Sequence, residues 1–411
     1  MPIEFKRRVQ VREYGGQQVA ITDTNVRSPL EIARELAPLI RSYADQIEEA
    51  RELPRPLFEA LADAGVFRLL IPRSLGGSEL DLPTYIEVIE VLGRADASTA
   101  WCINQGGVFA THSARMPQEV ARLIWVETPR SVVANSPVPD GTAITAEGGY
   151  RVTARQGFST GCRHAAWLAA NARILEAGRP RLLADGQPET RYLFVPADRA
   201  EIIDTWHVSG MRGTGTHHFA VEDVFVPEER TFLASTAVLR EPGPLYMFPR
   251  TLLFGSGDAA TALSVAGNSL EAFGELAGGK KPFRSPGLLS DQALVQFDIG
   301  RAEAQLRSGR ALLFESVRDA WETACATGAI SLDQRVSMRL AITHAIRVAV
   351  EVVDTVYNAA GASAVFRSSP LQRLFQDIHV ISQHIQSRPS NYELVGRFRL
   401  GVATEADMQR I

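Results

Sequence analysis

The chain has 411 residues, of which 45% are hydrophobic and 22% are charged, and its formal net charge is −4. These values are ordinary for a globular protein of two or three domains, and the scattered Lys and Arg residues argue against a nucleic-acid surface. The cysteines Cys102, Cys162 and Cys325 lie far apart, which argues against a disulfide framework and a CxxC metal site. The sequence has no signal-peptide core and no long uninterrupted apolar segment, so we expect a cytoplasmic protein without a membrane span.

The first part of the chain predicts helices. Residues 1–27 are polar and irregular, and we expect an arm there rather than a domain element. Ser28 followed by Pro29 indicates a helix start, since Ser is a favoured N-cap and Pro a favoured first helical residue. Apolar residues then recur at helical spacing as far as about residue 127. We therefore predict an N-terminal helical domain over residues 28–130.

Strand patterns occupy residues 131–238, where the apolar period shortens toward two. The stretch AITAEGGYRVTARQGFSTG (143–161) has the form strand, Gly-Gly turn, strand. Similar short runs follow, separated by Pro and Gly, over residues 165–174, 190–198, 200–208 and 217–227. We predict a compact central β domain, either a barrel or a sandwich.

Long helical periods return in residues 239–411. Four such helices are predicted, over residues 253–277, 290–327, 331–361 and 369–387. Their length and short connections favour an antiparallel four-helix bundle. Several are apolar around much of their circumference, and burial against an identical subunit would explain this.

Five segments in this order resemble the acyl-CoA dehydrogenase superfamily, and within it the two-component flavin-dependent monooxygenases that hydroxylate phenols, steroid-derived phenols, thiophenes and polyketides. They are GVFRLLIPRSLGG (65–77), ADASTAW (95–101), GGYRVTARQGFSTGCRHAAWL (148–168), GMRGTGTHHFAVEDVFVPEE (210–229) and AGASAVFRSSPLQRLFQDIHVISQHI (360–385). The resemblance implies an α+β multidomain chain with the acyl-CoA dehydrogenase fold: an N-terminal helical domain, a central β-barrel and a C-terminal four-helix bundle. It also implies a homotetramer, with the flavin between the β domain and the bundle.

The segment GFSTG holds the first candidate site residues. An aromatic side chain followed by two hydroxyls and a glycine can cover a planar ring and hydrogen-bond its edge, although an ordinary strand end would look the same. The resemblance implies that Phe158 and Thr160 lie beside the flavin N5 and O4, with Ser159 and Gly161 as their neighbours.

His384 is the second candidate. On a continuous helix His379 and His384 would be about 140° apart, so they would not form a zinc pair, and a lone histidine there is usually a packed core residue. Most acyl-CoA dehydrogenases place a catalytic Glu after a Tyr in this segment. Here His384 falls on the Tyr position and Ile385 on the Glu position, and an isoleucine cannot take a proton. Asp258 is the one acid between Arg250 and Glu271 that could replace the missing base.

A histidine at this position is typical of the monooxygenase branch. The resemblance implies reduced flavin (FMNH2 or FADH2) supplied by a separate NAD(P)H:flavin reductase, O2 as co-substrate, and a C4a-hydroperoxyflavin that hydroxylates an electron-rich small molecule. Near neutral pH a histidine can hydrogen-bond the peroxide or deprotonate a phenol. We assign that role to His384, and we assign retention of the peroxide to Thr160 with Ser159.

Candidate substrate contacts follow the STAW motif in the helical domain. Trp101 and Gln105 are about one turn apart and could line one face, and Asn104 and His112 are further polar candidates. Packing is an alternative role for Trp101.

The motif GMRGTGTHH is interpreted as a structural turn of the β domain. It offers Arg212 and Thr214 as weak candidates for flavin or substrate contacts. His217 and His218 are adjacent and would point to opposite sides of a strand, which argues against a shared metal ion. We expect no metal site.

Two further residues could hold flavin phosphates. In the resembled family a motif after the first bundle helix and a glycine-rich motif after the third contact the pyrophosphate of FAD. Lys280 and Gly361 occupy these positions here, while Arg284 replaces an expected glycine, so both FMN and FAD stay open. Two other functions also stay open: an acyl thioester dehydrogenase or oxidase with Asp258 as base, and a flavin-free homologue that binds a ligand or a partner.

Overall fold

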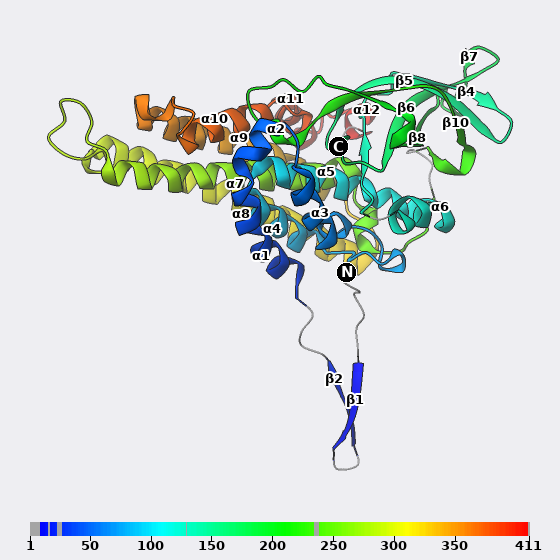
Figure 1. Ribbon diagram of the computed structural model, residues 1–411, viewed down its shortest axis with the longest axis horizontal. Coiled ribbons are helices and arrows are strands. Elements are labelled where there is room, and N and C mark those ends of the chain that lie inside the picture. Colours follow the sequence, from blue (N-terminus) through cyan, green and yellow to red (C-terminus); the bar gives the residue numbers. More distant parts are fainter. Residues whose placement is uncertain (1–8, 15–16, 23–26, 129, 234–237, 410–411) are drawn as a thin grey trace.

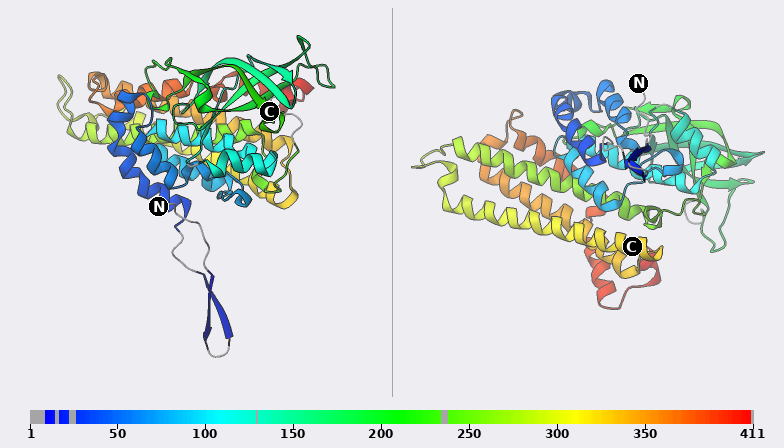
Figure 2. Two further views of the ribbon diagram at one scale, coloured as in Figure 1. Left: turned by 45° about the vertical axis from the view of Figure 1, so that its right-hand side comes forward. Right: turned by 90° about the horizontal axis from the view of Figure 1, so that it is seen from below.

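The computed structural model describes residues 9–14, 17–22, 27–128, 130–233 and 238–409. Long helices form an elongated body, and a curved sheet covers one end of it (Figure 1). Seen from below, the bundle helices extend well beyond the sheet at the opposite end (Figure 2). Within the described residues, no helix combines the length and the apolar character that crossing a membrane requires.

The N-terminal part is helical, as predicted. Its α-helices are α1 (Pro29–Ser42), α2 (Ala44–Ala50), α3 (Arg55–Asp63), α4 (Leu82–Gly93), α5 (Ala97–Ala110) and α6 (Gln118–Arg122). Ser28 caps α1 in a capping box with Glu31, which satisfies backbone groups at the helix start. Asp96 caps α5 by accepting from the backbone N–H of Thr99 at 2.7 Å. Nearly every residue of α5 is buried, so this helix runs through the centre of the molecule.

A backbone hairpin lies in the segment that we expected to be an irregular arm. It consists of β1 (Val9–Tyr14) and β2 (Gln17–Thr22), which pair antiparallel.

The central β domain is built on one nine-stranded sheet, in agreement with the prediction. Its strands are β3 (Val133–Asn135), β4 (Gly141–Ala146), β5 (Gly149–Ser159), β6 (Trp167–Glu176), β7 (Arg179–Pro180), β8 (Thr190–Pro196), β9 (Glu201–Ile203), β10 (His217–Pro227) and β11 (Thr231–Phe232). The order is β11-β8-β6-β4-β5-β10-β9, with β3 and β7 also paired to β6. The sheet curves like a barrel. In the strand order β6, β4 and β5 separate β8 from β10, yet β8 and β10 also contact each other. The predicted Gly-Gly turn joins β4 to β5, with Gly148 at φ +74°.

The C-terminal part contains the four predicted bundle helices and a short helical tail. They are α7 (Arg250–Gly279), α8 (Ala293–Thr327), α9 (Leu332–Ala360), α10 (Pro370–Ile381), α11 (Ser390–Arg399) and α12 (Glu405–Gln409). The first half of α7 is buried almost all round, because α4 and α5 pack on it as well as α9 and α10. The helices α5, with Trp101 and Gln105, and α7, with Asp258, therefore lie side by side.

Candidate active site

His384 lies in a sharp turn rather than on a helix. The helix α10 ends at Ile381, and His384 adopts an extended conformation with φ −67° and ψ 151° before the short 3-10 helix η11 (Ile385–Ser387). The expected helical relation between His379 and His384 is therefore wrong. His379 instead pairs with Asp354, with Nε2 and Oδ1 2.9 Å apart. Among the described residues no group of three metal-ligating side chains is found.

Side chains from three elements hold this turn in place. Ser387 donates from Oγ to the carbonyl of His384 at 3.1 Å, and Asn391 donates from Nδ2 to the carbonyl of Gln386 at 3.0 Å. The side-chain amide of Gln386 donates to the carbonyl of Thr251 at 2.8 Å and accepts from Arg339. These bonds restrict the position of the His384 backbone before any ligand arrives.

The ring of His384 faces the carboxylate of Asp258. Nδ1 of His384 lies 3.2 Å from Oδ2 of Asp258, whose side chain is fully buried. The histidine side chain is 33% exposed, while its Nδ1 atom is buried. The ring edge that carries Nε2 therefore faces open space. Trp101 packs edge-on against the imidazole, with ring centroids 5.3 Å apart.

The other oxygen of Asp258 is fixed by amide groups of α5. Nδ2 of Asn104 donates to Oδ1 at 2.9 Å, and Nε2 of Gln105 donates to the same atom at 3.0 Å. The buried hydroxyl of Tyr85 in turn donates to Oδ1 of Asn104 at 3.1 Å. Gly257 permits this arrangement, since a Cβ there would lie 2.0 Å from Oδ1 of Asn104. Asp258 is thus held from one side and turned toward His384 on the other.

A chain of threonine hydroxyls marks the edge of the β domain. Thr160 bonds Thr216 with 3.0 Å between the Oγ1 atoms, and Thr216 bonds Thr214 at 2.7 Å. Next to them Phe158 is a 63% exposed aromatic side chain at φ +59°, a backbone region that disfavours a bulky residue. A Cβ on Gly161 would meet no atom within 4 Å, so the space beside this edge is open.

His218 joins this exposed edge, which the sequence did not suggest. Its ring centroid lies 6.4 Å from that of Phe158. Gly157 makes room for it, because a Cβ there would lie 2.6 Å from Nε2 of His218. His217 points the other way and is fully buried, as the alternation of a strand predicts.

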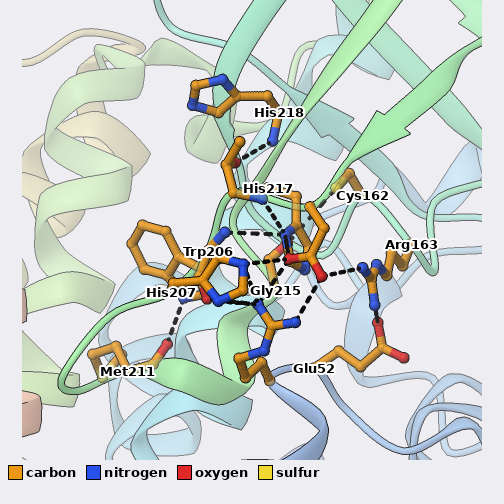
Figure 3. A network of polar contacts seen from close by, with 12 residues as sticks. Glu52, Cys162, Arg163, Trp206, His207, Met211, Gly215, His217 and His218 are labelled. Atoms are coloured by element: carbon orange, nitrogen blue, oxygen red, sulfur yellow. Dashed lines mark hydrogen bonds and ion pairs between the residues drawn. The ribbon is translucent and has the colours of Figure 1, made fainter.

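The loop that carries Thr214 and Thr216 is fastened to the helical domain. Arg51 donates to both carboxylate oxygens of Asp204 at 2.7 Å, and Nδ1 of His217 accepts from the backbone N–H groups of Thr205 and Trp206 at 3.2 Å (Figure 3). Nδ1 of His217 is therefore unprotonated, which fixes its tautomer.

Contacts through α5 and α10 connect the threonines with the His384 turn. Cys102, next to Trp101, donates from Sγ to the carbonyl of Thr214 at 3.6 Å. Asp377, near the end of α10, accepts from the backbone N–H of Met211 at 2.5 Å. Burial raises the pKa of Asp377 to about 7, although Arg373 opposes the shift. The same two helices thus position the exposed edge of the β domain and the His384 turn.

The structure does not bring all predicted residues to this place. Ser159 is fully buried and donates from Oγ to the carbonyl of Asn135 at 3.1 Å, so its hydroxyl faces away from the open edge. His112 is fully buried too, bonds Arg250 and packs against Phe232 with ring centroids 4.3 Å apart. Burial and the nearby Arg250 lower the pKa of His112 well below its usual value.

Two other predicted residues meet each other far from His384. Lys280 donates from Nζ to the carbonyl of Ala360, at 2.6 Å, beside Gly361 at φ +56°. Along α7, Lys280 lies about 33 Å from Asp258, given a rise of about 1.5 Å per residue. One subunit therefore does not offer both places to a single flavin ring. Arg212 is engaged elsewhere, since it donates from Nε to the carbonyl of Glu48 at 3.1 Å.

A planar, uncharged ring system with hydrogen-bonding edges fits the open edge of the β domain. Phe158 and His218 offer ring faces, Thr160 offers a hydroxyl, and Gly161 leaves space. The contacts of Phe158 and Thr160 with a flavin stay a prediction.

Family models match two parts of the chain. Residues 31–119 match the acyl-CoA dehydrogenase N-terminal domain, and residues 256–389 match the acyl-CoA dehydrogenase C-terminal domain. An FADH(2)-dependent resorcinol hydroxylase, oxygenase component, from Rhizobium sp. (strain MTP-10005) is 30% identical over 398 residues, which is 92% of this chain and 94% of the relative. The chain belongs to the acyl-CoA dehydrogenase superfamily, in its branch of flavin-dependent monooxygenases.

Other members of this branch show the same likeness. Indole-3-acetate monooxygenase from Pseudomonas putida is 29% identical over 361 residues, or 88% of this chain and 90% of the relative. The crystal structure of 3-HSA hydroxylase from Rhodococcus sp. RHA1 has a TM-score of 0.83 at 26% identity, covering 93% of this chain and 99% of that one. The predicted superfamily, branch and fold are confirmed.

Proposed function

We propose that the protein is the oxygenase component of a two-component flavin-dependent monooxygenase that hydroxylates an aromatic small molecule. The observation that carries this proposal is the His384–Asp258 pair beside Ile385. Ile385 occupies the position of the dehydrogenase base and is a 54% exposed hydrocarbon. The relatives named above are monooxygenases and hydroxylases, and they match nearly the whole chain.

The reduced flavin, when bound, supplies the two electrons that activate O2, so that one oxygen atom enters the substrate and the other leaves as water. The protein's own residues bind, orient and exchange protons. Phe158 and His218 cover a ring face, and the hydroxyl of Thr160 is available to the ring edge. His384 presents Nε2 to the open side and holds or moves a proton there.

The contacts of Asp258 argue against a thioester dehydrogenase. A catalytic base needs a free carboxylate oxygen within hydrogen-bond reach of the substrate proton. One oxygen of Asp258 accepts from Asn104 and Gln105, the other faces His384, and the side chain has no exposed surface.

A separate NAD(P)H:flavin reductase is the implied partner, because the relatives are named as oxygenase components. We also propose a homotetramer in the cytoplasm. Large apolar side chains are exposed at the far end of the bundle, including Phe283 at 88%, Leu294 at 72% and Phe297 at 65%. Burial of these side chains by another subunit would also bring Lys280 and Gly361 of one chain toward the flavin of its neighbour. Contact of Lys280 and Gly361 with the flavin of the neighbouring subunit would favour FAD, whose pyrophosphate they could hold, over FMN.

Rapid mixing of the anaerobic protein and reduced flavin with O2 tests the function. We expect the protein to slow the release of H2O2 compared with free reduced flavin, and a phenol or indole substrate to lower its yield. Purified protein that keeps oxidised flavin, and whose flavin is bleached anaerobically by an acyl-CoA thioester, would instead establish the dehydrogenase.

A further inference from the structure

Two arginine side chains lie together on α9, behind the turn that carries His384. Arg335 and Arg339 are four residues apart on this helix, so they are neighbours on one face. Arg339 is 5% exposed, and Arg335 is half-buried. The Nε atoms of both are buried and have no hydrogen-bond partner among the described residues. Arg339 donates to Oε1 of Gln386, whereas the Arg335 side chain makes no hydrogen bond or ion pair within the described chain.

Neither guanidinium is paired with an acidic side chain of the described residues. Burial, followed by the charge of Arg335, lowers the pKa of Arg339 to about 10, and no acidic group opposes this shift. Arg373 of α10 is more exposed, yet three carboxylates lie near it, of which Oδ2 of Asp96 is the nearest at 2.6 Å. A buried charge without a counter-ion is strongly destabilising. The surroundings of Arg339 therefore call for a negative charge from outside the described chain.

Two helix N-termini add positive potential at the same place. Arg335 is the fourth residue of α9, in the turn where the helix dipole favours anions over cations. The side-chain amide of Gln386 bridges Arg339 to the carbonyl of Thr251, in the first turn of α7. Helix α7 begins after Pro249, and no side chain of the described residues caps it. Positive charge and N–H donors are thus in excess here.

A small dianion of the phosphate type matches this excess. Two guanidinium groups carry two positive charges, and their planar forks of N–H donors fit the oxygens of phosphate or sulfate. A single carboxylate would neutralise one charge and leave the other. The Nη atoms of Arg335 and Nη2 of Arg339 have no partner, and they are not among the enclosed atoms of the described residues, so a small ligand can approach them.

We propose that Arg335 and Arg339 form a binding site for a small phosphate-type dianion, and that the bound anion stabilises the turn that carries His384. The connection is Gln386, which lies two residues beyond His384. Its side chain joins Arg339 to α7, and its carbonyl accepts from Oγ1 of Thr343 at 2.8 Å. An anion on the guanidinium compensates the buried charge and holds Arg339 where it donates to Gln386.

Titration of the flavin-free, full-length protein with anions tests the site. Sodium phosphate and sodium sulfate are compared with sodium chloride at equal ionic strength, because salts also screen charges and change stability in general. Calorimetry measures binding, and thermal unfolding measures stabilisation. Arg335→Gln removes one of the two charges. Arg318→Gln is the matched control, since Arg318 is an exposed arginine of the adjacent helix α8 that makes no ion pair within the described chain.

We expect the melting temperature of wild type and of Arg318→Gln to rise with the concentration of phosphate or sulfate. In Arg335→Gln the Kd for both anions should be larger by about tenfold or more, because a charged hydrogen-bonding group is lost. Acetate should bind to wild type about tenfold more weakly than sulfate, because it carries one charge. If Arg335→Gln does not fold, Arg335→Lys keeps the charge without the planar fork and should give a smaller loss of affinity.

Hydrogen exchange tests the connection with the turn. Saturating sulfate should slow exchange of the backbone amides of residues 382–388 by about threefold or more in wild type, and should leave it unchanged in Arg335→Gln.

Three results would contradict the proposal. If phosphate and sulfate had no more effect than chloride on wild type, the two charges would already be neutralised, as by a carboxylate of another copy of the chain, and the site would be overturned. Equal affinity in wild type and Arg335→Gln would place the anion elsewhere. Anion binding that left exchange in residues 382–388 unchanged would overturn the stabilisation of the turn. Acetate binding as tight as that of sulfate would overturn the assignment to dianions.

Discussion

Gly257→Ala is the sharpest perturbation of the buried cluster behind His384. A Cβ at this position would lie 2.0 Å from Oδ1 and 2.3 Å from Cγ of Asn104, so the amide must move. Moving it breaks the bonds of Asn104 to Asp258 (2.9 Å) and Phe254 (3.0 Å), and that of Tyr85 to Asn104 (3.1 Å). We expect loss of stability although alanine is the better helix former.

The magnitude follows from counting the buried polar groups left without partners. The amide of Asn104 and the hydroxyl of Tyr85 each cost about 1–3 kcal/mol when unsatisfied, about 4 kcal/mol together. The helix propensity of alanine offsets about 1 kcal/mol of this. Gly257→Ala should therefore lower the free energy of unfolding by about 3 kcal/mol.

Gly274→Ala, in the same helix, is the matched control. A Cβ there meets no atom within 4 Å, so the variant should be more stable than wild type by up to about 1 kcal/mol. Urea unfolding followed by circular dichroism, with all three proteins under one set of conditions, measures the difference. If Gly257→Ala proved as stable as Gly274→Ala, the tightly packed Asn104–Asp258 cluster would be refuted.

Three further predictions concern the β-domain edge and α10. Phe158→Ala and Phe158→Gly should both weaken flavin binding in a fluorescence titration. Phe158→Gly alone should also raise the free energy of unfolding, by about 1 kcal/mol, because glycine adopts the backbone φ of +59° without strain. Equal stability of the two variants would contradict this strain. Thr160→Val should increase the H2O2 released per O2 consumed, whereas Ser159→Ala should lower stability by about 1 kcal/mol without that increase; the reverse result would exchange their roles. Because burial raises the pKa of Asp377 to about 7, the folded state keeps a proton that the unfolded state loses between about pH 4 and pH 7, so the free energy of unfolding falls as pH rises through this range. Asp377→Asn lacks this dependence, so in urea unfolding its free energy of unfolding should rise relative to that of wild type as the pH increases from 5 to 8. If the difference in free energy between the two proteins stayed constant over this range, Asp377 would already be ionised at pH 5.

The helices and the β4–β5 hairpin could be predicted because their signals are local. Ser28 with Pro29, the Gly-Gly turn and the apolar periods each act over a few residues. Pairing between distant segments has no such signal. Asp258 was recognised as an isolated acid, but its contacts with Asn104, Gln105 and His384 depend on the packing of α5 and the 384 turn against α7.

Local backbone changes explain the candidate residues that the structure places elsewhere. His112 would lie on the face of Trp101 if the helix continued, since eleven residues make about three turns. The α-helix ends at Ala110, however, and His112 turns toward Arg250 and Phe232. The sequence does not show that Phe158 is exposed while Ser159 is buried. That difference goes with the positive φ at Phe158, which the sequence does not reveal.

Incorporation of 18O2 tests the central claim most directly. Protein with reduced flavin is mixed with 18O2 and a set of phenols and indoles, binding of each compound is followed by protein fluorescence, and products are analysed by mass spectrometry. The account predicts a product with one 18O atom from at least one bound compound, and loss of that product in His384→Asn. If compounds bind but all the O2 consumed is recovered as H2O2, the assignment as an aromatic monooxygenase is contradicted.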